Sequence, residues 1–96
     1  MADNINDVLE ACLNTSFTFP ADFRLQDGVY GGLVMAAAIA KAQSVAAYPV
    51  RTLQLNFSAL AKPNIETSIE LICRRRGSKT ETFDIAFFQQ EQCVAH

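Results

Sequence analysis

The hydrophobic positions of this chain follow a helical spacing near its start and a mostly alternating spacing later on. The first apolar residues recur at i, i+3, i+4, i+7 and i+8, and they are Ile5, Val8, Leu9, Cys12 and Leu13. This spacing predicts a short amphipathic helix, for which Asp3 or Asn4 can serve as the N-cap. We expect the helix to dock onto the body of the domain through its apolar stripe.

A second and longer helical segment is apolar on every face. It runs from Gly28 to Pro49 and reads GVYGGLVMAAAIAKAQSVAAYP, with no charged side chain between Val29 and Ala40. Its alanines favour helix, and a helix that is apolar all round is typically buried on all sides. The apolar run is too short to span a bilayer, and Pro49 ends the helix because the residue before a proline avoids the helical region. The pattern therefore predicts one long, central, buried helix.

The remaining segments alternate between apolar and polar residues, as half-buried strands do. An irregular first strand is expected around Phe17–Leu25, where Pro20 interrupts the alternation, before a turn at Gln26-Asp27-Gly28. Three further strands are expected after the helix, and their inward positions are Leu53, Leu55, Phe57 and Ala59; Ile65, Thr67, Ile69, Leu71 and Cys73; and Phe83, Ile85 and Phe87. A polar hairpin over 76–79, a turn over 90–92 and a last strand from Cys93 complete an antiparallel meander.

This order of elements indicates an α+β domain in which a sheet wraps around a helix. One short sheet covers only part of a helix that is apolar on all sides, so the remaining face calls for a second sheet or a second copy of this one. The last strand begins only at Cys93, which leaves an edge for pairing. The pattern thus predicts association with another such domain.

Composition narrows the class of protein. The chain has 96 residues, enough for one domain (1–96), and a net charge of −2 with a pI near 5.2, which argues against nucleic-acid binding. Its three cysteines form no C-x-x-C pair, which favours reduced thiols over disulfides or zinc. The first residues contain no secretory signal, so a cytoplasmic protein is expected. No membrane partner is expected, because the apolar helix is too short to span a bilayer, and no metal site is expected, because the sequence shows no cluster of metal ligands.

Several segments resemble acyl-CoA thioesterases of the double-hotdog type, and specifically the N-terminal hotdog of that family. The segments are GVYGGLVMAAAIAKA, RTLQLNFSALAKP, IETSIELICRRRGSKTETFDIAFFQ and QQEQCVAH, which together cover roughly residues 17–96. The resemblance implies a hotdog fold, an antiparallel sheet wrapped around a long central helix. In that family the catalytic Asp, Thr and Gln come from the C-terminal hotdog, which we do not find in these residues. The central helix of this chain carries no carboxylate.

The resemblance and the local chemistry together give candidate site residues. Gly28, Gly31 and Gly32 flank the helix start, where free amides can hold a thioester carbonyl; the alternative is a tight turn with close packing. Asp27 is a candidate catalytic base, or else a capping residue. Gln89 resembles the family's catalytic Gln in position, and the alternative is a solvated strand end.

Positive charge gathers at the predicted hairpin. Arg75 and Arg76 are candidates for binding the phosphates of coenzyme A, and the alternative is a solvated hairpin end. His96, the sole histidine, is the last residue, so neither a buried serine triad nor a dehydratase-like hotdog with a buried histidine is indicated.

The leading hypothesis is hydrolysis of acyl-CoA thioesters to free acid and CoA without a cofactor, coenzyme A being part of the substrate. The expected assembly is a homodimer, a higher homo-oligomer, or a pairing with a second hotdog domain. The alternative is a non-catalytic structural half that forms the interface and pocket wall for a catalytic partner.

Overall fold

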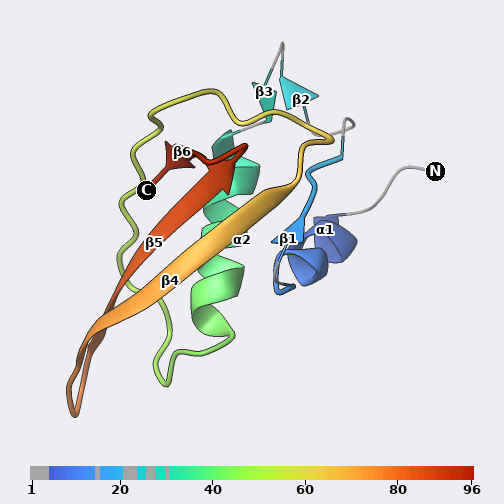
Figure 1. The fold of residues 1–96 in the computed structure, drawn as a ribbon. Helices are drawn as coiled ribbons and strands as arrows, with labels where there is room; N and C mark the ends of the chain where they lie inside the picture. The colour runs from blue at the N-terminus through green and yellow to red at the C-terminus, as the bar shows by residue number, and fades with distance from the viewer. Residues whose placement is uncertain (1–4, 15, 21–23, 26–27, 30) are drawn as a thin grey trace.

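The computed structural model describes residues 5–14, 16–20, 24–25, 28–29 and 31–96. Within these residues, two helices and six strands follow one another in the order α1, β1, β2, β3, α2, β4, β5, β6. Their bounds are α1 Ile5–Ala11, β1 Ser16–Phe17, β2 Arg24–Leu25, β3 Gly28–Val29, α2 Gly31–Gln43, β4 Thr67–Arg76, β5 Glu81–Gln89 and β6 Gln92–Ala95. The expected α+β architecture is confirmed (Figure 1).

The main sheet has four strands in the order β1-β4-β5-β6, all antiparallel. β4 and β5 form a long hairpin in which Thr67 pairs with Gln89 at one end and Arg76 with Glu81 at the other. A bulge between Cys73 and Arg75 shifts the register near the distal end. β2 and β3 form a separate small hairpin that leads into α2.

The predicted meander is confirmed in its main features. On β5, Phe87 is fully buried and Phe83 and Ile85 are half-buried, while Thr82 and Asp84 are exposed, as the alternation requires. The turn between β5 and β6 places Gln90 and Glu91 at positive φ, the conformation of a tight two-residue hairpin. The predicted caps Asp3 and Asn4, and Phe23 in the first predicted strand, lie outside the described residues.

The central helix differs from its prediction in length. α2 spans Gly31–Gln43, so the residues from Ser44 to Pro49 are not helical, and Gly28 and Val29 form β3. One face packs on the sheet through Leu33, Val34, Ala37 and Ala38, whereas Met35 and Ile39 are 38% and 39% exposed. A four-stranded sheet covers one side of a helix, and α1 adds only a partial second layer (Figure 1). One face of the helix is therefore uncovered in the single chain, as expected when one sheet covers only part of it, and burial of that face by a second domain stays a prediction.

The predicted strand over residues 53–59 is not a regular strand. The segment is extended, but its only β-bridge among the described residues joins Phe57 to Ala95. Neighbouring hydrogen bonds link Asn56 with His96 and Ser58 with Val94, so the segment runs along the outer side of β6. Alternation is present in the sequence, but among the described residues β6 pairs with only part of the segment.

The core lies between α1, α2 and the sheet. Its largest fully buried side chains are Phe19, Phe87, Val34, Thr67 and Cys12. Phe17 and Phe19 meet edge to face, with ring centroids 5.0 Å apart. Among the described residues no helix is long and apolar enough to cross a membrane.

Candidate functional site

The N-terminus of α2 is framed by the loop that precedes β4. The Val29 amide donates to the Ala61 carbonyl (2.8 Å), which fixes β3 and hence the start of the helix against that loop. The first-turn amides of a helix have no partner within the helix and lie at the positive end of its dipole. No acidic side chain lies in the first turn of α2. The helix end is therefore suited to accept an anionic or carbonyl oxygen.

The three glycines at this end occupy different environments. Gly28 is buried, and a Cβ there would clash with the Leu60 side chain and lie 3.2 Å from the Ala61 carbonyl oxygen, so a larger residue would force Leu60 to shift. A Cβ on Gly31 would lie 3.5 Å from Cζ of Phe57, an ordinary contact. Gly32 is exposed. Close packing, the alternative to a substrate-binding role, thus accounts for Gly28. The amides of Gly31 and Gly32 remain candidates for contact with a substrate.

Two exposed apolar side chains lie beside this helix end. Phe57, which lies next to Gly31, is 49% exposed, and Leu60, which packs on Gly28, is 54% exposed. First-turn helix amides next to exposed apolar surface provide the two features that an acyl thioester needs, a donor for its oxygen and contact for its chain.

Gln89 is buried and its side-chain amide is held on both sides. Its Oε1 accepts from the Lys62 amide, and its Nε2 donates to the Lys62 carbonyl and to Thr67 Oγ1, each at 2.9 Å. Thr67 is fully buried and donates in turn to the Ile65 carbonyl (3.0 Å). Both hydrogens of the Gln89 amide are thus engaged. The side chain joins the end of β5 to the start of β4 and to the loop that carries Ala61.

The network around Gln89 was not foreseen from the sequence. Its partners Lys62 and Thr67 lie 27 and 22 positions away along the chain, so no local motif signals the contact. A polar Thr67 at an inward position of a predicted strand was the one available sign, because a buried hydroxyl needs a partner.

The candidate phosphate-binding arginines lie at the opposite end of the hairpin. Arg76 is paired with Glu81 (Nε–Oε2 2.7 Å), and Arg75 is exposed with no ion pair among the described residues. At about 3.3 Å per residue, the β4 strand separates Thr67 from Arg76 by roughly 30 Å. One chain therefore does not bring these arginines together with Gln89 and the helix N-terminus. Asp27 lies outside the described residues.

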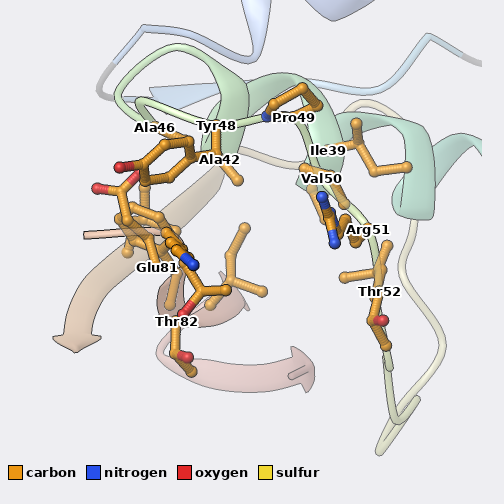
Figure 2. A pocket seen from close by; sticks show the side chains of 17 residues that line it. Ile39, Ala42, Ala46, Tyr48, Pro49, Val50, Arg51, Thr52, Glu81 and Thr82 are labelled. Atoms are coloured by element: carbon orange, nitrogen blue, oxygen red, sulfur yellow. The ribbon is translucent and has the colours of Figure 1, made fainter. Parts of the chain in front are cut away.

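A cavity lies at the other end of α2. It has a volume of about 480 Å³ and lies between the C-terminal part of α2, the segment 48–53 and the distal half of the hairpin (Figure 2). Hydrogen bonds from Tyr48 Oη to the Ser78 carbonyl and from the Ala47 amide to Glu81, both 2.6 Å, close its rim. None of the predicted site residues lines it. The volume of this cavity therefore does not identify it as the site formed by the predicted residues.

Cysteine chemistry is not indicated at the buried thiol. Burial raises the pKa of the Cys12 thiol to about 11, although the nearby Lys41 ammonium lowers it. The thiolate is the nucleophilic form, so Cys12 is protonated and unreactive near neutral pH. Among the described residues no group of three or more His, Cys, Asp or Glu lies together as metal ligands do.

Comparison with known proteins identifies the family. Residues 19–96 match the family model described as "Acyl-CoA thioesterase N-terminal domain", which is most of the chain. The chain belongs to this family of hotdog domains. A solved structure with the same fold is the E. coli PaaI protein from the phenylacetic acid degradation operon, with a TM-score of 0.71 over 95% of this chain and 86% of that one, at 17% identity. No curated protein matches the sequence.

Proposed function

We propose that this domain acts in the hydrolysis of acyl-CoA thioesters, as one hotdog of a pair. The observation that carries the proposal is the N-terminus of α2, where the first-turn amides, which have no partner within the helix, lie beside the exposed side chains of Phe57 and Leu60. Membership of the acyl-CoA thioesterase N-terminal family supports the same chemistry.

In the proposed reaction the thioester carbonyl accepts hydrogen bonds from the first amides of α2, near Gly31 and Gly32. Water attacks the carbonyl carbon and gives up a proton to a carboxylate, for which Asp27 is the candidate because it directly precedes Gly28 in the sequence. Negative charge that develops on the carbonyl oxygen is stabilised by the helix amides. The C–S bond then breaks, CoA leaves as a thiol after protonation, and the carboxylic acid remains.

Gln89 could either contact the thioester directly or position the residues around it. Direct contact with the thioester, as its position in the resemblance implies, needs a free amide hydrogen. In the present arrangement both hydrogens are used by Lys62 and Thr67, which favours a positioning role, since the loop held by Gln89 also holds β3.

Arg75 is the better of the two arginine candidates for a coenzyme A phosphate, because Arg76 is already paired with Glu81. Arg75 lies near the far end of β4 from Thr67, so we propose that it binds the coenzyme A of a thioester held on the paired hotdog. Arg75→Gln should then raise KM several-fold with little change in kcat. Arg74→Gln, at a residue already paired with Asp84, is the matched control and should leave KM near that of the unaltered protein.

The second candidate function is a non-catalytic half that supplies sheet, interface and pocket wall. The absence of an acidic residue from the first turn of α2 favours it, because hydrolysis then depends on a carboxylate from elsewhere.

A thiol-release assay with acyl-CoAs of graded chain length tests these proposals. We expect hydrolysis by the purified protein and a loss of about 100-fold or more in kcat for Asp27→Asn, the usual contribution of a general base. Asp84→Asn, an exposed hairpin residue, is the control. No release with any acyl chain from a folded oligomer would reject catalysis by this chain alone and support the structural half.

A further inference from the structure

The ring of Phe57 faces the first residue of α2 across a narrow space. A Cβ carbon placed on Gly31 would lie 3.5 Å from Cζ of Phe57 and 4.0 Å from its Cε1 and Cε2 atoms. These are the distances of ordinary contact between carbon atoms. A single methyl or methylene group therefore fills the space, which we call the Gly31–Phe57 gap, and a bulkier group would overlap the ring.

The backbone is fixed on both sides of the gap. Phe57 forms a β-bridge with Ala95, and the amides of its neighbours Asn56 and Ser58 donate to carbonyls in the β6 region at 2.6 and 3.0 Å. Gly31 begins α2, which packs on the sheet through its buried face. The width of the gap is therefore set by the Phe57 ring and by the lack of a side chain at Gly31.

The gap lies between a set of hydrogen-bond donors and an exposed apolar surface. The first-turn amides of α2 have no partner within the helix. Met35, which is 38% exposed, lies one helical turn after Gly31 and Gly32 and continues the apolar surface away from the gap. An acyl thioester has its groups in the same order, first the carbonyl oxygen, then the carbon next to the carbonyl, and then the hydrocarbon chain.

We propose that the carbon next to the thioester carbonyl occupies the Gly31–Phe57 gap, which makes Phe57 a specificity-determining residue. The substrate class is then the acyl-CoA thioesters that are unbranched at this carbon, because a branch would overlap the ring. This inference rests on the proposed function. A hydrocarbon side chain from a paired hotdog would fill the same space, but it would leave the neighbouring amides covered without an acceptor, which is unfavourable.

Two variants change the width of the gap in opposite directions. Phe57→Ala removes the ring, and because Phe57 is 49% exposed, its loss leaves the core in place. Gly31→Ala keeps the backbone amide and adds only the methyl group that the gap can hold, so it excludes the acyl carbon without removing a donor. Ile72→Ala removes an exposed apolar side chain from β4 and is the matched control.

Binding of two isomeric analogues to the full chain tests the proposal. They are the ketone analogues of pentanoyl-CoA and trimethylacetyl-CoA, in which a methylene group between the carbonyl and the sulfur prevents hydrolysis. We expect the unaltered protein and Ile72→Ala to bind the straight analogue about tenfold or more tightly than the branched one, the usual effect of a methyl group that does not fit.

The gap variants should change this preference. Phe57→Ala should bind the two analogues within about threefold of each other, mainly by binding the branched one more tightly. Gly31→Ala should bind the straight analogue about tenfold more weakly, and adding Phe57→Ala to it should restore most of the affinity, because the two residues act on the same space.

Three results would overturn the proposal. Equal affinity of the unaltered protein for both analogues, or a preference that Phe57→Ala leaves unchanged, would reject the gap as a subsite while the proposed function stands. Binding of neither analogue would reject both. A Gly31→Ala variant with an altered oligomeric state in sedimentation, but an unaltered affinity for the straight analogue, would assign the gap to a contact between protein chains.

Discussion

Replacement of Gln89 by leucine tests whether its amide holds the start of β4 to the end of β5. The substitution keeps the side-chain volume and removes three hydrogen bonds, two with the backbone of Lys62 and one with Thr67 Oγ1. Each such bond contributes a net 0.5–1.5 kcal/mol, and groups left buried without a partner cost more. We therefore expect a loss of about 2–4 kcal/mol in the free energy of unfolding. For a domain whose total stability is about 5–15 kcal/mol, that loss is large.

The measurement is urea unfolding at a fixed protein concentration, because association also shifts apparent stability. Gln92→Leu is the matched control, since Gln92 pairs with Gln89 across the β5–β6 hairpin but is exposed. A Thr67→Val variant and the double variant complete a mutant cycle, in which the two losses should be less than additive because they share one bond. If Gln89→Leu lowers the free energy of unfolding no more than Gln92→Leu does, the Gln89 amide does not hold β4 to β5.

The remaining predictions concern the glycines and the thiols. Gly28→Ala should lower the free energy of unfolding by about 1–3 kcal/mol, because Leu60 and the neighbouring backbone must shift. Gly31→Ala should be neutral or slightly stabilising. Thermal unfolding of both variants measures this, and equal losses of stability would contradict it. A thiol reagent at pH 8 should label the exposed Cys73 within minutes and Cys12 only after unfolding, and rapid labelling of Cys12 in the folded protein would contradict its burial. Burial raises the pKa of Cys12 in the folded protein above its ordinary value of 9.0, so the unfolded chain loses this proton first. The stability that this group contributes therefore falls between about pH 9 and about pH 11. Urea unfolding at pH 8 and pH 10.5 should show a smaller fall for Cys12→Ala than for the unaltered protein.

The strands after the central helix follow from the sequence because alternation reports directly which face is buried. Phe83, Ile85 and Phe87 lie inward on β5 as their spacing requires. The same alternation over Leu53–Ala59 predicts the side-chain faces but not a ladder, because a ladder also needs a neighbouring backbone. Here that neighbour is β6, whose region bonds, among the described residues, only with residues 56–59 of this segment.

The candidate site is predictable where it depends on local backbone and not where it depends on distant partners. Glycines at the start of an apolar helix indicate a tight entry, and Gly28 packs in that way against Leu60. The buried amide network of Gln89 joins segments that only the fold brings together, so its position was evident but its partners were not. Charge clustering likewise located Arg75 and Arg76 without revealing that Glu81 pairs with one of them.

The apolar residues of α2 extend onto a face of the helix that is not buried within one chain. Its exposed side includes Met35 and Ile39, which are four positions apart and therefore lie on one stripe, with the exposed Gly32 one turn before them. A surface helix of a monomer usually carries polar side chains on such a stripe, yet none occurs here before Gln43. The stripe begins at the helix end where Phe57 is also exposed. A second hotdog placed over this side of α2 would cover the stripe and enclose the first-turn amides of the helix at the same time, which links the proposed pairing to the proposed chemistry.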